Sequence, residues 1–379
     1  MPAPIYLDHH ATTPIDPRVR GAVRAYLEEE FGNPSNELHV LGRNARAAVE
    51  AARAEVAALV GARARDVIFT SGATESDNLA IQGLLRGRGG HAITQATEHD
   101  AVFETLRAME RDGVALTVLP VSAEGLIDPD SLRRAIRPET RLVSIMHVGN
   151  EVGAIQPIAE IAAIVHDSNA LLHVDAAQGT GLVPLDVAAL GVDLLSLSAH
   201  KMYGPKGVGA LVAGSRARAE LRPIAFGGGQ EDGLRSGTHD VPGIVGFGEA
   251  ARLMRLEGRE EAARLRALRD ELRARVEGFD GAIRLGPPDE RRHPGNVYMR
   301  FAGVHAASLV RALSPTVCAS TGSSCATGKD TRRIALALGL SPHEAKETLR
   351  LCVGRFNTPE DIEVAAETLG AALESLRVR

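Results

Sequence analysis

The sequence predicts an α/β protein with a mostly parallel sheet covered by helices, and a smaller α+β domain beside it. Two observations lead to this fold class. Between residues 66 and 213, short runs of β-forming residues alternate with longer segments whose apolar residues recur at helical spacing. After about residue 243, one long pattern laced with arginine and glutamate replaces this alternation. The alternation is typical of parallel strands joined by helices, and the change in texture indicates a second domain.

Seven apolar runs in the first region are expected to form the strands of the sheet, because each is short and lies between helical segments or turn residues. Helical spacing is found at residues 74–87, 101–113 and 157–169, the last with a proline at its start. The seven runs are residues 66–70, 91–94, 114–121, 141–147, 170–176, 193–199 and 207–214.

The second region and the length of the chain determine the expected domain organisation. A chain of 379 residues is too long for one simple core. The pattern laced with arginine and glutamate predicts a long helix that is broken near Gly258, and residues 296–301 predict a further strand. We therefore expect a large domain over about residues 16–255. A smaller domain would comprise residues 1–15 and 256–379, with the long helix joining the two.

Composition and charge argue against several kinds of protein. The hydrophobic share of 44% and the charged share of 24% are ordinary for a globular protein. The net charge of −5 and the scattered basic residues argue against direct binding to nucleic acid or to a membrane. Three cysteines without a CxxC pair argue against a disulfide framework, and we expect no metal site. We find neither a signal peptide nor an apolar run of membrane length, and we expect a cytoplasmic protein.

Polar residues gather where the predicted strands end. In open parallel sheets, the ligand crevice lies at the carboxyl ends of the strands. Because these side chains follow different strands, we expect them to converge on one site. They are Thr74 in the turn 70–74, His99, Asn150, Asp175, Gln178, Ser198, His200 and Lys201.

The stretch FTSGATES, residues 69–76, predicts a strand that runs through a turn of small residues into a helix. Such a turn lets backbone N–H groups approach an anion, and the helix N-terminus adds positive potential. The same residues could instead cap the helix through Ser71 or Thr74, with Glu75 in its first turn. The stretch alone is therefore compatible both with a phosphate site and with an ordinary helix cap.

Asp175 and Lys201 each follow a predicted buried strand. A buried aspartate needs a partner, which a helix cap, an arginine or a pyridinium nitrogen would supply. The chain has only four lysines against 39 arginines, so a lysine at position 201 is unusual. Lysine is preferred where an amine must lose its proton and bond covalently, as in a Schiff base. A phosphate-binding turn, a strand-end aspartate and a strand-end lysine in this order indicate a pyridoxal phosphate site.

Further motifs extend this pattern along nearly the whole chain. They are YLDHHATTP (6–14), FGNPSN (31–36), FTSGATESDNLAI (69–81), TEHDAV (97–102), SIMHVGNEVG (144–153), HVDAAQ (173–178), SLSAHKMYGPKG (196–207), RSGT (235–238), TGSSCAT (321–327) and RLCVGRF (350–356). With these motifs in this order, the chain resembles the cysteine desulfurases of the NifS/IscS type. These are fold-type I enzymes, so the resemblance implies a fold-type I transferase, pyridoxal 5'-phosphate as cofactor, and a homodimer.

The resemblance implies roles at the cofactor for the residues that match these motifs. Lys201 would join the cofactor covalently, and Asp175 would pair with its pyridine nitrogen. His99 would stack on the ring and assist proton transfer, and Gln178 would reach the phenolic oxygen. Asn150 would lie beside the cofactor and the substrate. The phosphate would be held by Ala73, Thr74, Ser198, His200 and, from the other subunit, Thr238.

Arg350 and Cys325 would act on the substrate. By the same resemblance, Arg350 would clamp the carboxylate of L-cysteine as a bidentate fork, and Cys325 would take up the sulfur as a persulfide. The residues themselves favour this role, since the small, polar neighbours of Cys325 predict an exposed loop over about 319–330. Cys352 lies among apolar neighbours and is expected in the core, and Cys318 is expected in a strand or the core.

The implied enzyme is a cysteine desulfurase, a sulfurtransferase that converts L-cysteine to L-alanine. The persulfide would pass to an acceptor protein, either an iron–sulfur scaffold for cluster assembly or a tRNA-thiolation protein. Three alternatives remain open: a selenocysteine lyase, a pyridoxal phosphate-dependent aminotransferase, and a non-catalytic adaptor of the same fold. The presence of the lysine, the aspartate and the loop cysteine argues against the adaptor.

Overall fold

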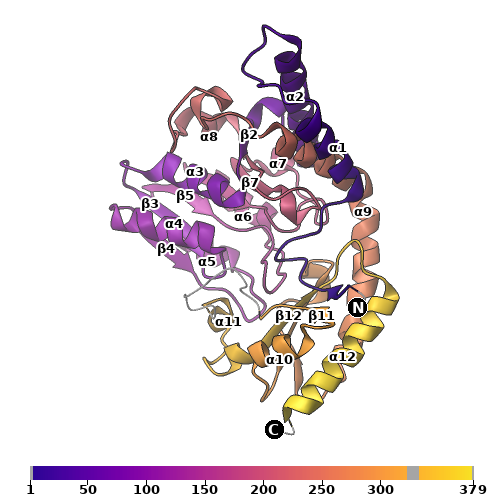
Figure 1. The fold of residues 1–379 in the computed structure, drawn as a ribbon. Coiled ribbons are helices and arrows are strands. Elements are labelled where there is room, and N and C mark those ends of the chain that lie inside the picture. Colours follow the sequence, from indigo (N-terminus) through magenta and orange to yellow (C-terminus); the bar gives the residue numbers. More distant parts are fainter. Residues whose placement is uncertain (1–2, 322–332, 378–379) are drawn as a thin grey trace.

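A seven-stranded sheet forms the centre of the larger part of the molecule (Figure 1), in a computed structural model that describes residues 3–321 and 333–377. Its strands are β2 (Val67–Thr70), β3 (His91–Gln95), β4 (Ala115–Leu119), β5 (Thr140–Ser144), β6 (Leu171–Asp175), β7 (Leu194–Ser198) and β8 (Gly209–Ala213). The strand order is β2-β8-β7-β6-β5-β3-β4. β8 is paired antiparallel with β2 and with β7, and all other pairs in this sheet are parallel. Each predicted run overlaps one of these strands, so the mostly parallel sheet is confirmed.

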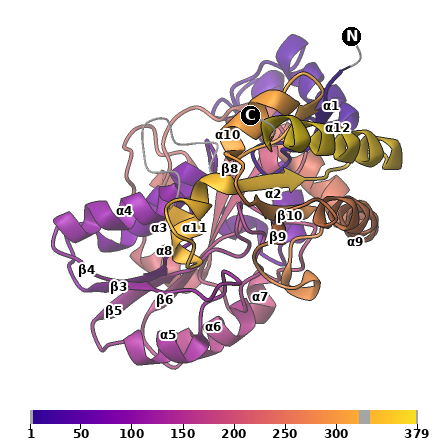
Figure 2. The same cartoon turned by 90° about the horizontal axis from the view of Figure 1, so that it is seen from below.

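Helices cover both faces of this sheet, as predicted (Figure 2). They are α1 (Pro17–Glu28), α2 (Val40–Leu59), α3 (Ala73–Leu85), α4 (Asp100–Arg111), α5 (Pro129–Ala135), α6 (Ile158–His166), α7 (Val187–Leu190), α8 (Ser215–Glu220) and α9 (Val241–Glu277). On one face, α3, α4 and α8 pack on strand residues such as Leu142 and Leu211. On the other face, α2, α5, α6 and α9 pack on residues such as Val143 and Leu195. Adjacent residues of one strand point to opposite faces, so burial of both faces explains the continuous apolar runs.

A second core lies beside the first. Its elements are β1 (Ile5–Tyr6), β9 (Ala282–Arg284), β10 (Asn296–Phe301), α10 (Ala306–Leu313), β11 (Val317–Cys318), α11 (Arg333–Ala337), β12 (Thr348–Cys352) and α12 (Pro359–Arg377). The strands β12, β10 and β9 form an antiparallel sheet, and β1 pairs with β11. Leu7 packs into this core with residues of α9, α10 and α12. The first residues of the chain therefore join the C-terminal part, while the predicted domain limits stay a prediction.

The helix α9 is one continuous helix, so the break predicted near Gly258 is wrong. Gly258 serves close packing instead, because a Cβ at this position would lie 2.1 Å from the carbonyl oxygen of Gly181. The first half of α9 packs in the first core and the second half in the second core. Figure 1 shows it running beside both parts, which agrees with the expected joining helix. Within residues 3–321 and 333–377, we find no helix with the length and apolar character needed to cross a membrane.

Candidate active site

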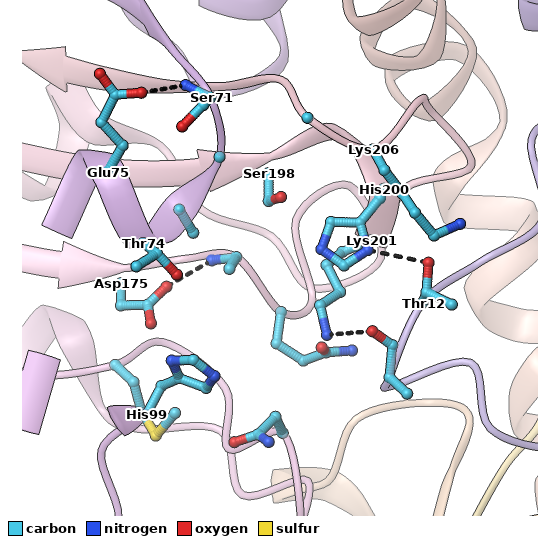
Figure 3. A pocket seen from close by; sticks show the side chains of 18 of the residues that line it. Thr12, Ser71, Thr74, Glu75, His99, Asp175, Ser198, His200, Lys201 and Lys206 are labelled. Carbon is cyan, nitrogen blue, oxygen red and sulfur yellow. Dashed lines mark hydrogen bonds between the residues drawn. The ribbon is translucent and has the colours of Figure 1, made fainter. Parts of the chain in front are cut away.

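A cavity of about 430 Å³ opens where β2, β6 and β7 end (Figure 3). Its walls come from segments far apart in the sequence, including the N-terminal stretch, the start of α3 and the turn after β7. The structure thus brings together most of the site that the sequence predicts. The predicted residues that line the cavity are Ala73, Thr74, His99, Asn150, Asp175, Gln178, Ser198, His200 and Lys201.

The turn between β2 and α3 forms one end of the cavity. Gly72 is the N-cap of α3, and its φ of 148° lies in a region that favours glycine. The N-cap position is thus occupied by a residue without a side chain, and no side chain makes the capping hydrogen bond. The alternative of an N-cap at Ser71 or Thr74 is therefore wrong. Glu75 accepts a hydrogen bond from the Ser71 N–H at 2.6 Å and another from Arg235 at 2.9 Å. The first N–H groups of α3 thus lie at the cavity wall, as a phosphate site requires.

Asp175, the last residue of β6, lies buried at the other side of the cavity. Its Oδ1 accepts a hydrogen bond from the Ala177 N–H at 2.9 Å. Burial raises the pKa of Asp175, and nearby cationic groups oppose this shift. Two amide oxygens in the cavity wall, Gln178 Oε1 and Asn150 Oδ1, are buried without a hydrogen-bond partner among the described residues. A buried carboxyl group and two amide oxygens without a hydrogen-bond partner among the described residues fit a polar cofactor with a pyridine nitrogen.

A second buried carboxyl group, that of Glu98, stands behind this wall. Its Oε1 accepts a hydrogen bond from the Met146 N–H at 2.6 Å, and Met146 itself lines the cavity. Burial, followed by the negative charge of Asp175, raises the pKa of Glu98 to about 8. The sequence analysis did not consider Glu98, although it lies directly before His99 in the TEHDAV motif.

His99 is the N-cap of α4 and lies near Asp175 in Figure 3. Its Nδ1 accepts a hydrogen bond from the Ala101 N–H at 3.1 Å. This bond assigns the hydrogen of the neutral ring to Nε2. Burial lowers the pKa of His99, which favours the neutral ring near pH 7.

Lys201 ends the 3₁₀ helix Ala199–Lys201, which follows β7. Its Nζ donates hydrogen bonds to two backbone carbonyl groups, those of His10 and, at 3.0 Å, Ala11. The amine therefore lies inside the cavity beside the N-terminal stretch. Both of these contacts are with main-chain carbonyl groups, and the positive charge of Lys201 also acts on the buried carboxyl group of Asp175.

The N-terminal stretch is part of the site, although the sequence analysis assigned it no role. Ala11 and Thr12 line the cavity. Thr12 Oγ1 lies 3.0 Å from His200 Nδ1, and the Thr13 N–H donates to the His200 carbonyl at 3.0 Å. Burial, followed by the charge of Lys201, lowers the pKa of His200 to about 4. The motif at residues 6–14 was the available signal for these residues.

Lys206 also lines the cavity and was missed. It is the second lysine of the stretch SLSAHKMYGPKG, so the scarcity of lysine that drew attention to Lys201 applied to it as well. An experiment is therefore needed to show which of the two lysines bonds to the cofactor.

Two predicted site residues do not line the cavity. Arg350, on β12, is buried, and its Nη1 donates to the Asn150 carbonyl at 2.9 Å. Its Nη2 forms an ion pair with Asp8 at 2.7 Å. Thr238 is exposed, outside the cavity of the same chain. The roles predicted for Arg350 and Thr238 stay predictions.

The cysteines differ in their surroundings. Cys325 lies outside the described residues, so its role stays a prediction. Cys352 is fully buried on β12, as expected, and burial raises the pKa of its thiol to about 12. Cys318 is partly exposed on β11, in agreement with the strand expected there.

Known proteins resemble this chain along its whole length. The family model of the class-V aminotransferases matches residues 5–364. A cysteine desulfurase IscS of Anaeromyxobacter dehalogenans is 45% identical, over 100% of this chain and 94% of the relative. A cysteine desulfurase IscS of Neisseria meningitidis is 43% identical, over 99% of this chain and 93% of the relative.

Solved structures agree with these relatives. A NifS-like protein superposes with a TM-score of 0.92 at 34% identity, covering 99% of this chain and 100% of the other. A NifS-like protein from Rickettsia africae has a TM-score of 0.89 at 30% identity, covering 98% of this chain and 100% of the other.

The fold and the cavity at its strand ends, together with these comparisons, define a pyridoxal phosphate-dependent enzyme of fold-type I. The family match leaves only short stretches at the two ends of the chain unmatched. The chain belongs to the aminotransferase class-V family, in agreement with its motifs.

Proposed function

We propose that this chain is a cysteine desulfurase, which converts L-cysteine to L-alanine and takes up the sulfur as a persulfide on Cys325. The observation that carries this proposal is the single cavity that Lys201, Asp175 and the start of α3 line together. The relatives named cysteine desulfurase IscS, which match nearly the whole chain, support the same reaction.

The cofactor would be held by groups that match its chemistry. When bound, pyridoxal phosphate withdraws electrons from the Cα of the substrate. Lys201 would hold it covalently, Asp175 would oppose the pyridine nitrogen with a negative charge, and the Gln178 amide would reach the phenolic oxygen. Asn150 would lie beside the cofactor. The phosphate group would be held by Ala73, Thr74, Ser198, His200 and, from a second copy of the chain, Thr238.

Lys201 and His99 would share the handling of protons. Nζ of Lys201 is the better base for the Cα proton, because it carries a lone pair once it is neutral. His99 has its Nδ1 taken by the Ala101 N–H, so its Nε2–H would donate a hydrogen bond into the cavity. We therefore assign base catalysis to Lys201, and ring stacking with assistance to proton transfer to His99.

Sulfur transfer would proceed through the thiolate of Cys325, since the thiolate is the nucleophile. Its sulfur attacks the substrate sulfur, so an S–S bond forms while the Cβ–S bond breaks and leaves its electron pair on Cβ. In the net reaction, the proton of the substrate thiol completes the methyl group of L-alanine. Arg350 would hold the substrate carboxylate beside Asn150.

The persulfide would pass to an acceptor protein, an iron–sulfur scaffold or a tRNA-thiolation protein. We also propose that the chain forms a homodimer. Thr238 is exposed, and Phe226, twelve residues before it, is 85% exposed. An exposed phenylalanine in the same part of the sequence as a residue expected to serve another subunit supports a contact between two copies. The cytoplasm is the proposed location, because reducing conditions there keep the thiol of Cys325 free.

Borohydride reduction of the holoprotein, followed by peptide mapping, tests the cofactor linkage. We expect the cofactor mass on Lys201, and a mass on Lys206 would contradict the assignment. Product analysis then tests the reaction in the wild type and in Cys325→Ala. L-alanine from L-cysteine, lost in the variant, is expected. A keto acid product would support an aminotransferase, and turnover restricted to L-selenocysteine would support a selenocysteine lyase.

A further inference from the structure

Arg333, the first residue of α11, reaches from the C-terminal part of the chain to the segment around His99. Its Nη1 donates a hydrogen bond to the Ala96 carbonyl at 2.5 Å. Its Nη2 donates to the Glu98 carbonyl at 2.6 Å and to Asp100 Oδ1 at 2.9 Å. The acceptors lie on both sides of His99 in the sequence, so one guanidinium ties down the backbone before it and the side chain after it.

The same guanidinium packs against α4, which begins directly after His99. Its central carbon lies 4.3 Å from the centre of the Phe103 ring, within the range of a cation–π contact. The Arg333 side chain is 26% exposed, so water reaches these contacts only partly. The planar fork of arginine suits several acceptors at once, whereas a lysine would satisfy fewer.

A neighbouring arginine provides a matched comparison. Arg107 lies with its guanidinium carbon 5.4 Å from the centre of the same Phe103 ring. Its Nη1 donates to Glu110, one turn along α4, at 2.7 Å. Removal of Arg107 therefore changes the packing of the ring without changing the contacts of Arg333 with the backbone.

The orientation of the His99 ring depends on the backbone that Arg333 holds. The ring is fixed by the hydrogen bond from the Ala101 N–H to Nδ1, and its other side lines the cavity. A shift of the peptide groups at residues 98–101 would move the ring with them. Displacement of an active-site group by 1 Å can lower a rate by about 100-fold.

Charged groups around His99 act on its pKa in both directions. Burial lowers the pKa most. The carboxylates of Asp175 and Asp100 raise it, and the cations of Lys201 and Arg333 lower it. Protonation of Nδ1 would break the hydrogen bond that caps α4, so the neutral ring is the form that keeps its orientation.

We propose that Arg333 is a positioning residue for His99: its guanidinium fixes the backbone before the histidine and the Asp100 side chain after it, and so holds the imidazole in the cavity. This inference rests on the proposed function, because it takes His99 to be the residue that meets the cofactor ring. Arg333 itself acts only through His99.

Three variants of the holoenzyme test this inference. Arg333→Met removes the fork and the charge, Arg333→Lys removes the fork alone, and Arg107→Met is the matched control. We expect kcat/KM for L-cysteine to fall about 10- to 100-fold in both Arg333 variants. In the control it should stay within about 2-fold, as for an ordinary surface change. The acidic limb of the pH profile should move to higher pH in Arg333→Met and stay in Arg333→Lys.

Visible circular dichroism of the bound cofactor gives a readout that needs no turnover. We expect an altered band in both Arg333 variants and a wild-type band in Arg107→Met. If the wild type releases no alanine, the proposed function fails, while the dichroism still tests the positioning of His99. If Arg333→Met does not fold, Arg333→Lys and its dichroism decide. Wild-type kcat/KM and dichroism in Arg333→Lys would overturn the inference, and so would an equal loss in Arg107→Met.

Discussion

Gly209, the first residue of β8, lies directly beneath the turn that we assign to the cofactor phosphate. A Cβ at this position would lie 2.6 Å from Gly72 Cα and 2.4 Å from the carbonyl oxygen of Leu197. Both neighbours are backbone atoms, which cannot rotate away as a side chain can. The substitution Gly209→Ala must therefore displace either the turn at Gly72 or the end of β7.

The free-energy cost of Gly209→Ala is estimated from the one carbon atom that has to be accommodated. Forcing one additional carbon into a packed region costs about 1–3 kcal/mol. If the turn at Gly72 yields, binding of the phosphate loses this amount, and the Kd for pyridoxal phosphate rises about 5- to 150-fold. Titration of the apoprotein with pyridoxal phosphate, followed by absorbance, measures this change directly.

Gly214→Ala is the matched control, because Gly214 follows the other end of β8. The nearest atom to a Cβ there is the Asp193 carbonyl oxygen at 3.4 Å, an ordinary contact. Affinity for the cofactor should be unchanged in this variant. An unchanged affinity in Gly209→Ala as well would refute the reasoning, and a loss of stability alone would mean that the strand yields rather than the turn.

Three further predictions concern stability and reactivity. Gly258→Ala should lower the free energy of unfolding in urea, because overpacking against a backbone oxygen costs up to about 3 kcal/mol and outweighs the roughly 1 kcal/mol gained in helix propensity. Gly21→Ala, in α1 with open space around its Cβ, should instead be neutral or stabilising. Glu98 has a folded-state pKa of about 8 against an ordinary 4.5, so the folded apoprotein binds its proton more tightly than the unfolded chain. Its contribution to stability is therefore full below pH 4.5 and lost as the pH rises through 8, and Glu98→Gln should flatten this part of a pH series of unfolding experiments. Alkylation of the native protein at pH 7 should label Cys352 far more slowly than Cys318, as peptide mass mapping would measure, and comparable labelling would contradict the burial of Cys352.

The pattern of residue types along the chain predicted the strands of the sheet and those site residues that act through their side chains. Buried strands such as β6 and β7 are mostly apolar, with one polar residue inside each (His173 and Ser196), and their last residues, Asp175 and Ser198, are polar at the edge where the cavity lies. Lys201 was visible because lysine is scarce in this chain. In these cases the chemistry is carried by the residue type itself.

Features that depend on the backbone were not predicted. Ala11 meets Lys201 through a carbonyl group, which every residue possesses, so no residue type marks this contact. Gly258 was interpreted as a break in a helix, because the same lack of a side chain serves both flexibility and close packing. Arg333 is one of 39 arginines, and only its three-dimensional neighbours distinguish it from the others.

The N-terminal stretch has a consequence for the order in which the enzyme matures. Leu7 is held by residues from near the end of the chain: its N–H donates to the Cys318 carbonyl at 2.9 Å, and its carbonyl accepts from the Cys352 N–H at 2.7 Å. The carbonyl groups that meet Lys201 follow a few residues later, at His10 and Ala11. A ribosome-bound chain thus lacks the anchors of this wall until its last strands have emerged. We expect pyridoxal phosphate to bind only after the finished polypeptide is released, so nascent chains on the ribosome should lack the visible absorbance of the bound cofactor.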